Sequence, residues 1–469
     1  MNCINEMYDG QYEIRTPYEL LSQYLQSLQI GQLIEKNKLT NELLLKNHIE
    51  FNLHDAYDFP KKIYPIDIIP RIISREEWEF IRIGITQRLK ALNLFLLDIY
   101  SSQSIIKDNI IPAELIYTSP YFIKELVGYL PAKSIFIHIS GFDLVRDVDG
   151  VYRILEDNLR IPSGVFSSLE SRWISDILYP ELLQLYNING NCEYPKILKE
   201  NLQSLIDKTK STTTIVVLTL GAKNSYSYLE QLFLARSMDV PLVEYKDLVV
   251  IDNKIFLKSN GNFQKVDIIY RRMDDEYFTP SIRKELKTEL FDKIYQVYLA
   301  GNVIIANALG NGIADDKALY FYVPKMIKYY LNEEPVLKQV DTFFMFEPEV
   351  RESIFKNINK YVIKKVDSMR GIGMLFGNSC TDLELLNIKA EVFKNSRNYI
   401  AQPIVNFSEL PCFINGKLSA RKIDLRPYAI FGSEGINVVD FALTRVAITE
   451  NTLDVSSGNG YRKDTFILT

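Results

Sequence analysis

Apolar residues recur along the chain at two periods, one typical of helices and one typical of strands. Between residues 75 and 100 they recur every three or four positions, on a stripe formed by Trp78, Ile81, Ile85, Leu89, Leu92 and Leu96. This spacing predicts an amphipathic helix, and Ser74 with Glu77 in front of it matches a capping box. Further helices are predicted over residues 16–32 and from residue 41, so the first 130 residues are expected to be largely helical.

Two strands are predicted between residues 142 and 158, where the period changes to two. Residues 142–148 and 151–158 flank Asp149 and Gly150, a pair that favours a two-residue hairpin turn. Counting back from that turn places Asp143 opposite Glu156. A four-residue loop over residues 147–150 would make this pair diagonal but keep both side chains on the same face.

The second strand places polar side chains where they suit a metal ion. At a period of two, Tyr152, Ile154, Glu156 and Asn158 share one face, on which Asp143 converges from the first strand. Two carboxylates and a carboxamide supply oxygen ligands of the kind that one or two magnesium ions prefer, together with nucleotide phosphates. A solvated hairpin edge with ordinary acidic residues is the alternative explanation.

The loop LRIPSG after this strand is a candidate for substrate binding. Its Gly164 lets a ligand approach backbone amides closely. Arg160 and Arg172 flank Ser163 and Gly164, and either arginine is suited to receive an anionic substrate group. A surface ion pair is the alternative for each arginine.

A second unit is predicted to begin near residue 211. A β-branched apolar run at residues 212–221 is followed by a helical pattern to about residue 238 and by the strand-like PLVEY. This β-α-β order predicts a parallel crossover. A further buried strand at residues 266–270 ends in RRMDDEY, and open α/β sheets bind ligands at the carboxyl ends of their strands. Asp274 and Asp275 are therefore candidate substrate contacts, with capping of the loop as the alternative.

Composition narrows the class of protein. The chain has 469 residues, of which 47% are hydrophobic and 24% charged, which predicts a soluble globular protein of two or three domains. A formal net charge of -5 gives no electrostatic basis for binding nucleic acid or an anionic membrane. The four cysteines form no CxxC pair, so neither a zinc site nor a disulfide framework is expected. No apolar run is long enough to cross a bilayer, and residues 1–13 lack the basic-then-apolar order of a signal peptide, so a cytoplasmic location is expected.

The segment GNGIADDKALYFYVP supplies the first candidate for phosphate binding. Its two aspartates can cap a helix whose first turn contains Lys317. A lysine at a helix N-terminus opposes the helix dipole, so a nearby anion would explain it. Tolerance of a long solvated side chain is the alternative. Later in the chain, Gly371 and Gly373 in DSMRGIGML could fold a turn over phosphates, although Gly-x-Gly alone is weak evidence.

Together, the metal hairpin and the ADDK segment resemble the circularly permuted ATP-grasp family (type 2), bacterial proteins similar to glutathionylspermidine synthase. In an ordinary ATP-grasp enzyme the Asp-then-Glu-x-Asn motif follows the lysines and the glycine loop, whereas here it comes first. The resemblance covers nearly the whole chain, through IPRII, GFDLVRDVDG, LEDNLRIPSG, YRRMDD, GNGIADDKA, YIAQP, DLRPY, LTRVA and KDTFIL.

The resemblance implies an α/β (α+β) fold of circularly permuted ATP-grasp type. It implies a helical N-terminal region over residues 1–130 and a permuted part with the metal motif over residues 131–210. A Rossmann-like pre-ATP-grasp domain would be inserted over residues 211–310, and the remaining ATP-grasp lobes would occupy residues 311–469.

It also implies ATP and Mg2+ as cofactors. Lys317 and Lys364 would hold phosphates, Gln402 would border the adenine, and Arg426 and Arg445 would stabilise the transferred phosphoryl group. The glycine loop departs from the family pattern D-G-S-G-G-Y-G-M.

Two of the loop glycines are replaced, by Ser368 and Arg370, and Lys365 stands where the family usually has proline. Side chains on this loop would hinder its approach to phosphates, or Arg370 would itself pair with a phosphate.

The expected reaction is ADP-forming ligation of a carboxylate to an amine through an acylphosphate. Magnesium at Asp143, Glu156 and Asn158 would offset phosphate charge, and Arg160 with the amides of Ser163 and Gly164 would orient the carboxylate. The substrates would be a small-molecule or peptide carboxylate and an amine, with no nucleic acid or membrane involved. Two alternatives stay open: a nucleotide-binding scaffold or sensor with a weakened site, and a ligase that modifies the terminus of a protein partner.

Overall fold

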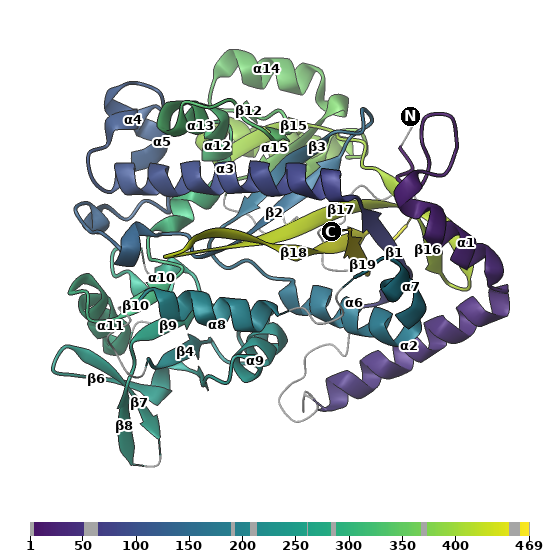
Figure 1. The fold of residues 1–469 in the computed structure, drawn as a ribbon. Coiled ribbons are helices and arrows are strands. Elements are labelled where there is room, and N and C mark those ends of the chain that lie inside the picture. The colour runs from purple at the N-terminus through teal and green to yellow at the C-terminus, as the bar shows by residue number, and fades with distance from the viewer. Residues whose placement is uncertain are drawn as a thin grey trace.

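A mixed eight-stranded sheet runs through the centre of the molecule (Figure 1). Its strands follow the order β1-β19-β18-β17-β2-β3-β11, and β16 pairs with β17 outside this path. The computed structural model describes residues 4–50, 64–188, 193–206, 213–259, 261–282, 288–366, 373–449 and 460–468. The strands of the central sheet are β1 (Ile66–Ile73), β2 (Ile139–Arg146), β3 (Tyr152–Asn158), β11 (Lys338–Gln339), β16 (Glu409–Ile414), β17 (Lys417–Gly432), β18 (Gly435–Val446) and β19 (Tyr461–Ile467).

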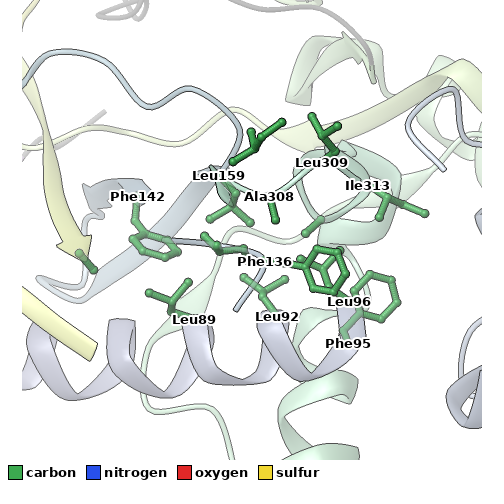
Figure 2. Close-up of a cluster of buried hydrophobic side chains, with 14 of the residues drawn as sticks. Leu89, Leu92, Phe95, Leu96, Phe136, Phe142, Leu159, Ala308, Leu309 and Ile313 are labelled. Atoms are coloured by element: carbon green, nitrogen blue, oxygen red, sulfur yellow. The ribbon is translucent and has the colours of Figure 1, made fainter. Parts of the chain in front are cut away.

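Helix α3 (Arg75–Ile99) crosses one face of this sheet and buries the predicted apolar stripe. Ser74 and Glu77 form the predicted capping box, because each side chain bonds the other's backbone N–H. Figure 2 shows Leu89 and Leu92 of α3 packed near Phe142 of β2. The opposite face of the sheet is covered by α6 (Val165–Leu178), which contacts β18 and β19.

A four-stranded parallel sheet has the order β10-β9-β4-β5. The predicted β-α-β order is confirmed, since α9 (Tyr228–Ser237) joins β4 (Ile215–Leu218) to β5 (Leu242–Val243). Strands β9 (Ile268–Arg271) and β10 (Ile304–Ala306) complete this sheet. A separate antiparallel sheet consists of β6 (Leu248–Ile251), β7 (Lys254–Ser259) and β8 (Asn262–Lys265).

A second antiparallel sheet, in the order β12-β15-β13-β14, forms a unit over residues 343–403 that we call the small lobe. This lobe has its own apolar core, with Ile363, Val392 and Tyr399 among its buried members. Its elements are β12 (Phe343–Phe344), α14 (Pro348–Lys356), β13 (Tyr361–Lys365), β14 (Leu375–Phe376), α15 (Asp382–Lys394) and β15 (Tyr399–Pro403).

The N-terminal helices differ from their predicted bounds. Helix α1 (Glu19–Ser27) ends before residue 32, and α2 (Ile30–Glu50) is one continuous helix rather than a new start at residue 41. Strand β1 also belongs to the first 130 residues and pairs in parallel with β19, so this region contributes to the central sheet. The predicted α/β class is confirmed, and the four predicted domain ranges stay a prediction.

Shorter helices connect these units. The shorter connecting helices are α4 (Ser104–Lys107), α5 (Ala113–Tyr117), α7 (Pro180–Leu185), α8 (Tyr194–Ser204), α10 (Asp275–Phe278), α11 (Glu289–Leu299), α12 (Lys317–Tyr320) and α13 (Val323–Leu331), with 3-10 turns at Thr16–Tyr18, Lys124–Leu126, Ala132–Ser134, Tyr245–Asp247, Asn311–Asp315, Ile358–Lys360 and Ser396–Asn398. In the described residues no helix is long and apolar enough to span a membrane.

Candidate functional site

Strands β2 and β3 bring Asp143 directly opposite Glu156, as predicted, but not through a two-residue turn. The last pair before the loop is Arg146 with Tyr152, which leaves residues 147–151 in the loop. A bulge next to Asp143 then shifts the register by one residue, because Leu155 has no partner on β2. The longer loop and the bulge compensate each other, so the predicted pairing is confirmed although the predicted turn is wrong.

The bulge also changes which side chains share a face of β3. Tyr152 and Ile154 are buried on the side of α3, and after the bulge Asp157 points to that side as well. The Arg88 guanidinium of α3 binds both oxygens of Asp157, each at 2.7 Å. Glu156 therefore lies on the other face, and the predicted shared face of Tyr152, Ile154 and Glu156 is wrong. The extra residue reverses the alternation that the sequence pattern shows.

Asp143 is buried between two arginines on this second face. Arg426 donates to its two oxygens at 2.5 and 2.9 Å, and Arg445 donates to one of them at 2.7 Å. Arg445 is in turn bound by Asp424, its cross-strand partner on β17. Burial by itself raises the pKa of Asp143, but the two guanidinium groups outweigh it and hold this pKa well below its ordinary value. The Asn158 side-chain amide also donates to Asp143, at 3.3 Å.

Glu156 forms an ion pair with Lys317, whose Nζ lies 2.8 Å from a carboxylate oxygen. Lys317 begins α12, and Asp316 caps that helix by accepting from the backbone N–H of Ala318 at 2.9 Å. Burial raises the pKa of Glu156, but Lys317 and Lys364 outweigh burial and lower that pKa from its ordinary value. The sequence led us to expect an anion beside Lys317, and Glu156 is such an anion.

One pocket joins Glu156 and Lys317 to the small lobe. Lys364 on β13 and Gln402 on β15 line it from adjacent strands, and Glu156 and Lys317 line it from the central sheet and α12. The Gln402 amide nitrogen donates to Thr342 at 2.9 Å, while its amide oxygen is buried without a partner among the described residues. The remaining lining residues are Leu155, Asp157, Ala314, Asp315, Asp316, Tyr320 and Ile400.

The polar groups of this region fit a magnesium–nucleotide complex by their chemistry. Across the described chain, no three histidine, cysteine, aspartate or glutamate side chains gather as a metal site. The predicted metal ligands are Asp143, Glu156 and the side-chain amide oxygen of Asn158, which are hard oxygen donors on one face. In the structure Asp143 is paired with Arg426 and Arg445, and Glu156 with Lys317, so a metal would have to replace some of these contacts. Lys317 and Lys364 line the pocket with Glu156, whereas Asp143 and Asn158 do not, and positive charge of this kind suits phosphate oxygens.

Arg160, predicted to receive a substrate carboxylate, is already held by two carboxylates. Its Nε donates to Asp315 at 2.7 Å and its Nη1 to Asp274 at 3.1 Å. The guanidinium also lies over the Tyr121 ring, 4.4 Å from its centroid. Arg160 and Asp274 thus meet, as a partly buried ion pair that links the loop after β3 to the segment after β9 of the parallel sheet.

The amide of Gly164 is occupied as well. It donates to a carboxylate oxygen of Glu230, on α9, at 2.6 Å. Arg272 binds the other Glu230 oxygen at 2.8 Å and the Ser163 hydroxyl at 2.9 Å. On the opposite side, Arg426 donates to the Ser163 carbonyl at 3.0 Å. The predicted substrate loop therefore lies between Arg426 on one side and Glu230 of α9 on the other.

Two other predicted substrate contacts, Arg172 and Asp275, are buried in ion pairs with neighbouring side chains. Arg172 is buried against β19, where its Nε binds Asp464 at 2.8 Å. Asp275 is buried and pairs with Arg271 at 2.9 Å, and burial raises the pKa of its carboxyl group. Neither lines the pocket described above.

The predicted glycine loop falls largely outside the described residues. Arg370 and Gly371 belong to that part of the chain, so their phosphate contacts stay a prediction. Gly373 is described and has a φ of +75°, in the left-handed region that favours glycine.

The structure adds two residues that the sequence did not single out as site residues. Asp424 shares its strand face with Arg426, an alternation visible in RKIDLRPY, and this signal would have identified it. Glu230 lies in an ordinary helical stretch far from the loop that it binds, so the sequence carries no signal for it.

Comparison with known proteins agrees with this geometry. The family model for circularly permuted ATP-grasp type 2 matches residues 70–447. An uncharacterized protein of Synechocystis sp. is 39% identical over 93% of this chain and 91% of its own length. A protein of Frankia casuarinae named putative glutamate–cysteine ligase is 33% identical over 99% of this chain, which spans 53% of that protein.

A solved structure has the same fold. A glutathione synthetase-like effector from Globodera pallida, in its apo form, aligns over 100% of both chains with a TM-score of 0.59 and 12% sequence identity. At this identity the likeness concerns the fold alone. Because the family model covers most of the sequence, the chain belongs to the circularly permuted ATP-grasp type 2 family.

Proposed function

We propose that this protein is an ATP-dependent, ADP-forming ligase that joins a carboxylate to an amine. The observation that carries the proposal is the pocket in which Glu156, Lys317, Lys364 and Gln402 meet from four separate segments. Membership of the ATP-grasp family and the ligase name of the Frankia relative support the same reaction class.

Different pocket residues bind different parts of the nucleotide. Lys317 and Lys364 bind phosphate oxygens, and Lys317 exchanges its bond to Glu156 for one to phosphate. The buried oxygen of Gln402 accepts a hydrogen bond from the base. Asp143, Glu156 and Asn158 would hold magnesium, which would supply positive charge to offset that of the phosphates.

The arginines on the same face act on the transferred group. A substrate carboxylate oxygen attacks the γ-phosphorus, the bond to ADP breaks, and an acylphosphate forms. Arg426 and Arg445 stabilise the charge on the phosphoryl oxygens, and Asp143 and Asp424 hold both guanidinium groups in place. The amine then attacks the acyl carbon, and inorganic phosphate and a proton leave.

The substrate carboxylate binds near Ser163, whose carbonyl is held by Arg426. The Gly164 amide becomes available to it only when Glu230 moves away, because Glu230 accepts that N–H in the structure. Arg160 acts here by holding the loop rather than by direct contact, since Asp315 and Asp274 occupy its guanidinium.

Glu156→Gln tests the proposal, with Asp149→Asn as the matched control. Both changes remove one carboxylate charge from the β2–β3 hairpin. Asp149, however, lies in the loop between the strands, where it pairs with Arg153 and accepts the N–H of Val151. We expect the wild-type protein to release ADP only when both a carboxylate and an amine are present. Glu156→Gln should lower the rate of this ADP release about 100-fold or more, because the charges of the metal and the phosphates are no longer balanced.

The assay is ADP formation across a panel of carboxylates and amines, followed by coupled absorbance. Asp149→Asn should retain wild-type turnover. Wild-type turnover in Glu156→Gln would remove this residue from the mechanism. Mg-ATP binding without turnover on any substrate pair would favour the nucleotide-binding scaffold or sensor instead.

A further inference from the structure

The small lobe supplies two of the pocket residues, so its position relative to the central sheet sets the width of the pocket. Lys364 and Gln402 lie on β13 and β15, which pair over five consecutive positions, from Tyr361 with Pro403 to Lys365 with Tyr399. The lobe also has its own apolar core. The two pocket residues therefore move together when the lobe moves.

Besides the apolar contacts of Ile400 and Val366 with the main core, Arg397 forms polar contacts between the lobe and the rest of the molecule. Arg397 precedes β15, and its Nη2 donates to Asp316 at 2.8 Å and to the Leu115 carbonyl at 3.0 Å. Its Nε donates to the Thr118 hydroxyl at 3.3 Å. The Arg397 side chain is 13% exposed and that of Asp316 is fully buried, so this ion pair is shielded from water.

Asp316 connects this contact to the pocket. The same carboxylate caps α12 through the N–H of Ala318 and accepts the Ser119 hydroxyl at 2.7 Å. Asp316 lines the pocket itself, and Lys317 follows it in the chain. One carboxylate thus fixes both the start of the helix that carries Lys317 and the lobe that carries Lys364.

We propose that Arg397 is a positioning residue that latches the small lobe to α12 and thereby sets the spacing between Lys317 and Lys364. With the latch intact, both ammonium groups face one pocket and bind phosphates at the same time. Without it, the lobe keeps its apolar contacts to the main core through Ile400 and Val366 but loses the ion pair at α12, and the nucleotide must bear part of the cost of holding the two lysines together. The consequence for nucleotide affinity rests on the proposed function; the latch itself does not.

Arg397→Ala tests the latch, with Arg351→Ala as its matched control. Arg351 belongs to the same lobe, but its Nη1 donates to the carbonyls of Met345 and Phe346 and its guanidinium lies over Phe393, all inside the lobe. Both changes remove one guanidinium from the lobe. Only Arg397→Ala cuts the connection to α12.

Two measurements on the full chain separate the latch from its consequence. Amide hydrogen exchange of the free protein should rise in residues 113–119 and 312–320 for Arg397→Ala, and stay at the wild-type level there for Arg351→Ala. Calorimetric titration with Mg-ATP should give about tenfold weaker binding for Arg397→Ala, the order expected for lost charge-assisted hydrogen bonds. Arg397→Lys, which keeps the charge beside Asp316, should recover part of the affinity.

Unchanged exchange in Arg397→Ala would overturn the latch, whatever the nucleotide result. Raised exchange with wild-type Mg-ATP affinity would overturn its effect on the pocket. A wild-type protein that binds no Mg-ATP would contradict the proposed function and the affinity effect together, while the exchange measurement would still decide the latch.

Discussion

The buried ion pair between Arg88 and Asp157 determines which face of β3 carries Glu156. Replacing Arg88 by methionine keeps a long apolar side chain on α3 but removes both bonds to Asp157. Asp157 would then be a buried carboxylate without its cation. It would favour turning to solvent, and that rotation would carry Glu156 away from the pocket.

The size of the effect follows from the burial of the pair. The side chains of Arg88 and Asp157 are 2% and 3% exposed, so water screens their interaction very little. Breaking such a pair from one side costs about 3–5 kcal/mol, because the remaining charge stays buried. The double change Arg88→Met with Asp157→Leu leaves no buried charge, and should return to within about 2 kcal/mol of the wild type.

Thermal unfolding followed by circular dichroism measures this prediction. Arg88→Met should lower the unfolding midpoint by about 3–5 °C, and the double variant should recover most of that loss. Arg82→Met is the matched control on the same helix, because Arg82 forms an exposed pair with Glu79, and its midpoint should equal that of the wild type. A drop in Arg88→Met no larger than in this control would refute the reasoning.

Two further predictions concern the loop after β3 and the charge of the pocket. Gly164→Ala should lower the free energy of unfolding by about 2 kcal/mol or more. Gly164 has a φ of +106°, and an added Cβ would lie 2.7 Å from the Tyr428 hydroxyl oxygen. An unchanged denaturation midpoint would contradict this prediction. Lys317→Met should lower stability at pH 7 more than at pH 4. Because folding lowers the pKa of Glu156 from its ordinary value of 4.5, the ionised Glu156 stabilises the folded chain at pH values above 4.5. This contribution is lost as the pH falls through the lowered pKa. Equal losses at both pH values would contradict it.

Local patterns predicted those parts of the fold that depend on neighbouring residues. The apolar stripe and capping box of α3 appear as predicted, because both are encoded within a few turns of one helix. The order of β4, α9 and β5 was equally visible in the sequence. The bulge of β3 was not, since Asp157 turns toward α3 only through Arg88, a partner distant in the chain.

In the candidate site, too, the sequence identified individual residues but not their partners from distant segments. The family resemblance named Glu156, Lys317 and Lys364, which line one pocket in the structure. The loop residues LRIPSG indicated Arg160 and the Gly164 amide as substrate contacts, whereas both are bonded to carboxylates of other segments. Such partners come from tertiary contacts that no local pattern encodes.

The measurement that tests the central claim most directly is calorimetric titration of the wild-type protein with Mg-ATP. The claim is that the pocket between Lys317 and Lys364 binds the nucleotide. We expect saturable binding of one nucleotide per chain, weakened at least about tenfold by Lys317→Met. Lys196→Met, which removes an exposed lysine paired with Glu193, should bind as the wild type does. No binding at about millimolar nucleotide, or equal affinity in Lys317→Met, would contradict the claim.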